Sequence, residues 1–315
     1  MSDNGGTQPT AHISIPGRGL SATHCLLERR ADRLRVYDQH STNGTFLRGR
    51  RIDVADLNPG DTFSPNPITL VAMNEEMYQN RPLLYEIIGS GFRPSPDTVM
   101  VEAATGSGPI LITGDRGCGH ERLAQAIHNM SLRRGQKMVE LDTNDRDAQI
   151  AIAKSASQAR TTVVLSFAAK ATPIDPLLSS MLWSTSFGIR VIVLAGTEKT
   201  ARDSLGADLV GQMRHIHLRQ LAYRTVEIDQ LLDGMLAEKQ APFRTADLTR
   251  ENQSALRQHS WPKNLAELRQ LAGALVAHAA AGNLREAGQR EGRSHSALGR
   301  DFQRVGLTFP LFRHG

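Results

Sequence analysis

Apolar and polar residues follow three different patterns along the 315-residue chain. Between residues 12 and 73 the apolar residues form short runs, among them HCLL, RLRVYD and PITLVAM, separated by Gly, Asn, Pro and Asp and without helical spacing. Short apolar runs bounded by turn residues are typical of strands. This part of the chain is therefore predicted to be an all-β module.

The middle of the chain changes to a mixed pattern. From about 83 to 220, strand-like runs (PILITG, KMVELD, TTVVLSF, IRVIVLAG) alternate with helical stretches (ERLAQAIHNM, DAQIAIAKSASQA, DPLLSSMLWS). This alternation predicts a parallel sheet covered by helices. Beyond residue 224 only helical stretches follow, and the segment 89–97, rich in Gly, Ser and Pro, is the predicted linker.

Cysteine content and hydropathy exclude several classes of protein. Cys25 and Cys118 lie far apart, and neither has cysteine or histidine neighbours at ligand spacing, so we expect neither a disulfide framework nor a metal site. No apolar run approaches the roughly 20 residues of a membrane helix. The first residues, MSDNGGTQPT, also lack the basic start and apolar stretch of a signal peptide. We expect a cytoplasmic protein without membrane contact.

Positive charge is concentrated near one end of the chain. The formal net charge is +5, and residues 281–315 contain six arginines against three acidic residues. A basic end points toward nucleic acid as a partner, with solvated surface arginines as the alternative explanation.

Two motifs in the β module carry a family resemblance. A Ser-x-x-His precedes a strand, which is followed by Ser-Thr-Asn-Gly-Thr and a basic hairpin; the residues are Ser21, His24, Asp38, Ser41, Thr42, Asn43, Gly44 and Thr45. This pattern resembles a forkhead-associated (FHA) domain, which implies a β-sandwich that binds phosphothreonine peptides. Asn-Gly supports a tight turn, and short hydroxyl and amide side chains supply hydrogen bonds suited to a phosphate.

The module departs from that family in its phosphate contacts. The family's arginine falls near Thr7, and Gly17 and Arg18 come too late to replace it, while Ala22 stands where a polar or basic neighbour is common. The first strands of the family have no room before residue 12, so we expect a truncated sandwich. Two interpretations stay open: a residual β module for protein contact, or phosphopeptide capture. The capture would use Ser21, Thr42 and Asn43.

A glycine-rich turn follows the run PILITG. The Gly114-x4-Gly119 spacing is that of a phosphate-binding loop between a strand and a helix. The landmarks LDTN, TTVVLSF, RVIVLAGT, LGADLVGQMRHIHLRQLAYRTVEI and HSWPKNLAELRQL follow in order. Together they resemble sigma-54-dependent activators of the NtrC type, which implies an AAA+ α/β domain with a helical lid. The candidate nucleotide-binding residues are Gly114, Gly117, Gly119, His120 and Glu121.

The charges that phosphoryl transfer needs are missing at these landmarks. His120 replaces the lysine that holds the phosphates, and a mostly neutral imidazole is a poor substitute. The resemblance places the family's Asp-Glu pair at Ser166 and Phe167 and its sensor asparagine at Thr197. It places the family's three catalytic arginines at Gly206, Gln212 and Ala266. We therefore expect no catalytic residue, no ATPase activity and no cofactor. The glycines then only turn the strand into the helix, with weak, non-catalytic nucleotide binding as the alternative.

The same resemblance exposes a missing loop. The segment between MVELD and TTVVL is too short for the GAFTGA loop with which this family grips its sigma factor. Remodelling of that polymerase is therefore not expected.

The last helical stretches carry a third resemblance. GNLREAGQREGRSHSALGRDFQRVGL resembles a Fis-type helix-turn-helix, with Asn283 and Glu286 as a capping pair and Gly292 in the turn. Glu291 and Arg293 stand where that family has buried apolar residues. The expected DNA-binding residues are Arg293, Ser294, His295, Ser296, Arg300 and Arg304, with Arg300 and Arg304 near phosphates. A basic helical hairpin for dimerisation or docking is the alternative.

These parts predict a multidomain chain. It comprises a truncated all-β FHA-like sandwich (1–80), a degenerate AAA+-like α/β P-loop domain (81–222), a helical lid (223–280) and a C-terminal helix-turn-helix (281–315). We expect a transcriptional regulator that binds double-stranded DNA without ATP hydrolysis. The alternative is an adaptor that binds a phosphothreonine protein or an AAA+ paralogue, and a homo-oligomer stays open.

Overall fold

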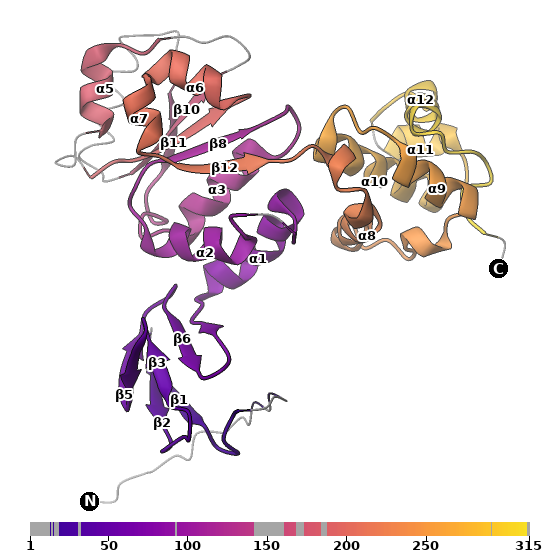
Figure 1. Cartoon of the computed structure of the whole chain (residues 1–315). Coiled ribbons are helices and arrows are strands. Elements are labelled where there is room, and N and C mark those ends of the chain that lie inside the picture. Colours follow the sequence, from indigo (N-terminus) through magenta and orange to yellow (C-terminus); the bar gives the residue numbers. More distant parts are fainter. Residues whose placement is uncertain are drawn as a thin grey trace, which may run out of the picture. The chain divides into compact units, whose positions relative to one another are not determined.

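A computed structural model describes residues 13, 15, 19–30, 33–91, 93–141, 161–167, 173–183, 188–290 and 292–313. The chain forms two compact units, Met1–Asn74 and Glu75–Gly315 (Figure 1). The predicted linker 89–97 is wrong as a division between domains, because it joins two helices inside the second unit. The domain boundaries at 80, 222 and 280 stay predictions.

The first unit is built from short antiparallel strands, as predicted. They are β1 (Cys25–Arg30), β2 (Arg33–Asp38), β3 (Thr45–Leu47), β4 (Arg50–Ile52), β5 (Val54–Leu57), β6 (Thr62–Pro65) and β7 (Leu70–Val71). One sheet has the order β1-β2-β5 and the other β4-β3-β6-β7. Val36 and Leu57 from the first sheet pack with Phe63 of the second, so the core lies between the two sheets.

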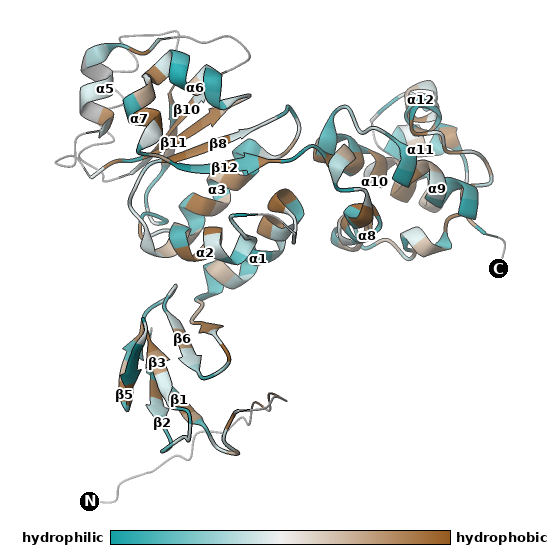
Figure 2. Cartoon of the chain, in the orientation of Figure 1, coloured by the Kyte–Doolittle hydropathy of each residue, from teal (hydrophilic) through white to brown (hydrophobic). Residues whose placement is uncertain are grey.

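The second unit contains the predicted parallel sheet. Its strands are β8 (Ile110–Gly114), β9 (Met138–Leu141), β10 (Thr162–Phe167), β11 (Arg190–Ala195) and β12 (Arg214–Leu218). They lie in the order β12-β8-β11-β10-β9, and every neighbouring pair is parallel. Figure 2 shows hydrophobic residues concentrated in the central strands, whereas β12 at the edge is largely hydrophilic. Burial on both faces explains the continuous apolar runs of β10 and β11.

Helices cover both faces of this sheet (Figure 1). One face carries α1 (Glu75–Ile88), α2 (Pro96–Thr105) and α3 (His120–Met130), and the other carries α5 (Pro176–Trp183), α6 (Glu198–Leu205) and α7 (Ala207–Gly211). The apolar side chains of α6 and α7 join the core formed by β10 and β11. The last three residues of LDTN, the stretch DAQIAIAKSASQA and the segment 143–160, where the GAFTGA loop is expected to be missing, lie outside the described residues.

Two buried arginines fasten the first two helices to the rest of the unit. Arg190, at the start of β11, donates to the carbonyl oxygens of Ala103 (2.9 Å) and Glu102 (3.2 Å) near the end of α2. Arg224 donates in the same way to Ile87 (3.0 Å) and Glu86 (2.8 Å) at the end of α1. Helix C-terminal carbonyls carry partial negative charge, so each guanidinium stabilises a helix end. Burial lowers the pKa of Arg190 to about 10.

The rest of the second unit is helical. It comprises α8 (Ile228–Glu238), α9 (Arg250–Gln258), α10 (Asn264–Ala281), α11 (Leu284–Arg290) and α12 (His295–Val305). Trp261 is buried between α9 and α10, and its indole N–H donates to the carbonyl of Leu256 (3.1 Å). No helix among the described residues is long and apolar enough to cross a membrane.

The segment after α12 returns to α9. The buried side chain of Asn252 accepts a hydrogen bond from the Thr308 backbone N–H (2.8 Å) and donates to the carbonyl of Leu311 (3.2 Å). Leu248 pairs with Phe312 in an isolated antiparallel bridge. These contacts hold the end of the chain to the same helical layer as α8 to α10, so α11 and α12 belong to one packed body with α10.

Candidate functional site

The turn between β8 and α3 has the backbone form of the predicted phosphate-binding loop. β8 ends at Gly114 and α3 begins at His120, and Gly114, Gly117 and Gly119 have φ values of 150°, 84° and 102°. Residues with a side chain are strained at such φ values, so the shape of the turn requires glycine at these three positions. The predicted nucleotide-binding residues thus lie together at one end of the sheet.

The start of α10 packs directly against this loop. The backbone N–H of Ala266 donates to the carbonyl of Gly117 (3.2 Å), and the Asn264 side chain donates to the carbonyl of Arg116 (3.0 Å). A Cβ atom at Gly117 would overlap the carbonyl oxygen of Lys263. The loop therefore uses part of its own polar backbone to hold the helical layer.

His120, which stands where a working loop has lysine, is a buried and neutral side chain. It is 9% exposed, and its Nε2 atom has no hydrogen-bond partner within the described residues. Burial lowers the pKa of His120 from its ordinary value, which favours the neutral imidazole at pH 7. Glu121 is exposed in the first turn of α3 and adds a negative charge beside the loop.

Three other positions that the resemblance marks as catalytic have structural partners. Ser166 of β10 donates to the Oε1 atom of Glu140 on β9 (2.9 Å). Phe167 is buried in the core between the sheet and α6. Thr197 caps the N-terminus of α6 by accepting from the backbone N–H of Thr200 (3.1 Å). Glu140 is a carboxylate that sequence reasoning missed here, because it comes from a neighbouring strand.

The three positions where the family has arginine hold no cation in the structure. Gly206 lies between α6 and α7 with a φ of 91°, and Gln212 follows the last turn of α7. Ala266 lies in the first turn of α10, and its Cβ would be 3.4 Å from a Cβ atom added at Gly117. A small side chain at 266 permits the close approach of α10 to the loop.

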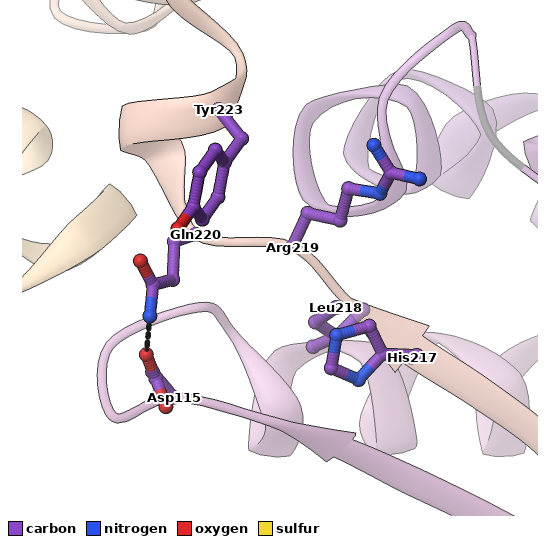
Figure 3. Close-up of a pocket in the computed structure, with 6 residues that line it drawn as sticks. All are labelled: Asp115, His217, Leu218, Arg219, Gln220 and Tyr223. Atoms are coloured by element: carbon purple, nitrogen blue, oxygen red, sulfur yellow. Dashed lines mark hydrogen bonds between the residues drawn. The ribbon is translucent and has the colours of Figure 1, made fainter.

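A pocket of about 360 Å³ opens between the loop and the end of β12 (Figure 3). Its lining residues are Asp115, His217, Leu218, Arg219, Gln220 and Tyr223. Gln220 donates to the carboxylate of Asp115, which joins the loop to the segment after β12. The volume lies at the small end of the range for ligand pockets, about 300 to 1,000 Å³.

A polar cluster at the edge of the sheet adjoins this pocket. The hydroxyl oxygen of Thr113 lies 2.7 Å from Nε2 of His215 and 3.0 Å from Nδ1 of His217. The His-x-His spacing places both imidazoles on one face of β12, and His215 also lies 3.7 Å from Glu198. Burial lowers the pKa of His215. The described residues contain no group of three side chains suited to hold a metal ion.

The predicted peptide-binding residues of the first unit come together from two loops. Ser21 accepts a hydrogen bond at Oγ from the backbone N–H of Thr42 (3.1 Å), and the Asn43 side chain donates to the carbonyl of Gly19 (2.7 Å). The imidazole of His24 lies between the loops, 3.3 Å from the N–H of Ser21. The positions of Thr7, Gly17 and Arg18 lie outside the described residues.

The second of these loops is ordered by a carboxylate. Asp38 accepts hydrogen bonds from the hydroxyls of Ser41 (2.6 Å) and Thr45 (2.7 Å). Burial opposes ionisation, but these bonds outweigh it and lower the pKa of Asp38 to about 2. Arg51 donates to the carbonyl of Ser41 (3.4 Å) and lies over Gly44, so one cation of the basic hairpin borders the loop.

The third predicted surface is α12. Ser294 caps this helix by accepting from the backbone N–H of Ala297 (3.2 Å), and Gly292 has a φ of 63° in the preceding turn. Leu298 and Phe302 are buried on the inner side of α12. His295, Ser296 and Arg300 are exposed on its outer side. Glu291 lies outside the described residues.

Two residues predicted to contact DNA also form ion pairs within the protein. Arg293 and Arg304 both bind the carboxylate of Asp301, at 2.6 and 3.1 Å. Arg304 also binds Glu267 on α10 at 2.8 Å. Both carboxylates are buried, with Asp301 5% and Glu267 1% exposed. Arg304 therefore links α12 to α10, whereas Arg293 links the turn before α12 to that helix. Of the predicted arginines, Arg300 has no ion pair within the described part of the chain.

Two family models match separate parts of the chain. Residues 4–64 match the FHA domain and residues 97–155 match the Sigma-54 interaction domain. The chain therefore contains an FHA domain and an AAA+-like sigma-54 interaction domain. No curated protein matches its sequence.

Similar solved structures include bacterial proteins of low identity. NtrX from Brucella abortus, in complex with ATP, is 17% identical over 76% of this chain and 69% of its own, with a TM-score of 0.42. Domain III of the replication initiation protein DnaA from Thermotoga maritima is 15% identical over 73% of this chain and 93% of its own, with a TM-score of 0.37.

Proposed function

We propose that this chain is a transcriptional regulator that binds double-stranded DNA through α11 and α12 and uses its AAA+ domain as a scaffold without ATP hydrolysis. One observation carries the proposal. The phosphate-binding loop has its glycine geometry but faces a buried, neutral His120 and is packed against the start of α10. Such a loop connects the parallel sheet to the helical layer that begins with α10. This structural role does not require catalysis.

The chemistry of the site supports the absence of hydrolysis. Phosphoryl transfer depends on positioned cations and on metal-binding carboxylates. The lysine position holds an uncharged imidazole, Ser166 occupies the place of a carboxylate, and Ala266 occupies the place of an arginine. A neighbouring group could compensate for the loss of one catalytic residue. Here the losses lie on separate strands and helices, so each removes an independent contribution to hydrolysis.

The purified full chain is expected to release phosphate from ATP at the background rate. The reason is that His120 stands at the loop position whose lysine, in a working site, neutralises the charge that develops on the phosphates. Phosphate release should be measured with magnesium present for the natural chain, for His120→Ala and for Glu140→Gln. Turnover above background that either substitution abolishes would show that the site is a working ATPase.

The DNA-binding part of the proposal rests on the surface of α12. Its capped N-terminus and buried inner face hold the helix firmly, so the exposed His295, Ser296 and Arg300 are presented on a rigid element. Helices of this kind place their first residues against base edges in the major groove, and arginine binds phosphate or guanine. The structure leaves Arg300 available for such a contact.

Substitution of Arg300→Gln in the full chain is expected to weaken binding to duplex DNA by about tenfold, the loss of roughly 1.4 kcal/mol that one arginine contact supplies. Fluorescence anisotropy with a labelled duplex measures this directly. Arg250→Gln, at an exposed position on α9, is the matched control and should bind as the natural chain does. Equal binding by both variants, or none by the natural chain, would remove the DNA-binding assignment.

A second function is favoured by a different observation. In the first unit, Ser21, Thr42 and Asn43 lie together on two hydrogen-bonded loops, which is an arrangement suited to phosphopeptide capture. The chain would then act as an adaptor for a phosphothreonine protein. The adaptor function gains support if the natural chain fails to bind duplex DNA but binds a phosphothreonine peptide more tightly than its unphosphorylated form.

A further inference from the structure

A positively charged groove of about 630 Å³ lies between the start of α10 and α12. The charged residues that line it are Lys263, Arg293, Arg300, Asp301 and Arg304. Lys263 immediately precedes α10, far from the others in sequence. The folding of α12 back onto α10 therefore places a lysine of the helical lid beside the predicted DNA-binding helix.

The charges in this groove are not balanced. Asp301 is its single carboxylate, and that side chain is already bound by Arg293, Arg304 and the amide of Gln270 (2.7 Å). Lys263 and Arg300 are exposed and form no ion pair within the described residues. Two cations from separate segments are thus available on one open surface.

We propose that this groove binds a backbone phosphate of duplex DNA that lies against α12, with Lys263 as a contact outside the two terminal helices. This inference rests on the proposed function. Lysine binds phosphate as a point charge, and arginine binds it with two parallel N–H groups. Lys263 and Arg300 can therefore bind the same phosphate or two successive phosphates of one strand. Such contacts fix the position of a protein on the duplex without reading its sequence.

The lining of the groove favours a nucleic acid backbone over a free nucleotide. No aromatic side chain lines it, and Ala297 is its single apolar residue. A base would therefore find no surface on which to stack, whereas a phosphodiester needs only the cations and an open groove. The surrounding arginines also keep Asp301 neutralised, which removes the repulsion that a bare carboxylate would exert on phosphate.

The test uses the full chain and a short labelled duplex of mixed sequence. Affinity is measured by anisotropy across salt concentrations of about 50 to 200 mM for the natural chain and for variants Lys263→Gln, Lys263→Arg and Lys239→Gln. Each phosphate contact contributes about 0.9 to the slope of log affinity against log salt. Lys263→Gln is expected to make that slope shallower by about 0.9, and Lys263→Arg should restore it. Lys239 is exposed at the end of α8, so Lys239→Gln should leave the slope unchanged.

The outcomes separate this inference from the function on which it rests. If Lys263→Gln keeps the natural slope while Arg300→Gln weakens binding, the groove proposal is overturned and the DNA-binding function stands. If the natural chain binds no duplex, both fail. A slope that falls equally for Lys239→Gln would show a general effect of net charge and would also overturn the role of Lys263.

Discussion

The substitution Gly117→Ala is expected to lower the free energy of unfolding of the second unit by about 3 kcal/mol. Two costs combine: an alanine in left-handed backbone loses about 1 to 2 kcal/mol, and an overpacked contact costs about 1 to 3 kcal/mol. The contact is with the backbone carbonyl of Lys263, which cannot rotate away as a side chain would. Relief requires the loop and the start of α10 to separate.

Urea unfolding followed by tryptophan fluorescence measures this loss, since Trp261 is buried beside the start of α10. Gly108→Ala is the matched control, because a Cβ there meets no atom within 4 Å and the residue precedes β8 in the same unit. A loss no larger than that of Gly108→Ala would mean that the loop and α10 are not held together in solution.

Glu267→Ala is expected to destabilise the helical layer by about 3 kcal/mol, the lower end of the range for a broken buried ion pair. Glu267 is 1% exposed and accepts hydrogen bonds from the backbone N–H of Lys263 (3.0 Å), while its other oxygen lies near Arg304 (2.8 Å) and His259 (3.2 Å). Truncation leaves these donors without their acceptor. Arg304 is 38% exposed, so water recovers part of the loss.

The same unfolding measurement applies, with Glu251→Ala on the exposed side of α9 as the control. Glu267→Ala should also speed amide hydrogen exchange in α12, because Arg304 then has Asp301 alone to hold it. Equal stability of the two variants would show that the carboxylate contributes no net stabilisation. In that case α12 would be held by its apolar face.

The sequence predicted the layers of this protein because burial and periodicity are local signals. The continuous apolar runs at β10 and β11 indicate strands covered on both faces, and the Gly114 and Gly119 spacing indicates a sharp turn from strand to helix. The cap at Ser294 follows from its position before an amphipathic helix. Each of these features depends on a few consecutive residues.

Contacts between distant segments were beyond such reasoning. No local pattern marks Arg190 or Arg224, yet both are buried and donate to the C-terminal carbonyls of helices much earlier in the chain. Arg304 was assigned to DNA, and nothing in the local pattern shows that Glu267 of α10 lies beside it. A charged residue is informative only when its partner is known, and the partner is set by the fold.

The continuity of α10 has a mechanical consequence. Its first turn touches the loop between β8 and α3, and its 18 residues form one uninterrupted helix about 27 Å long at 1.5 Å per residue. Gln270 and Glu267 of α10 bind residues of α12. A tilt of α10 at the loop would therefore move α12 together with α10. A small displacement of the loop would then reorient the exposed residues of α12, among them Arg300, with no chemical step.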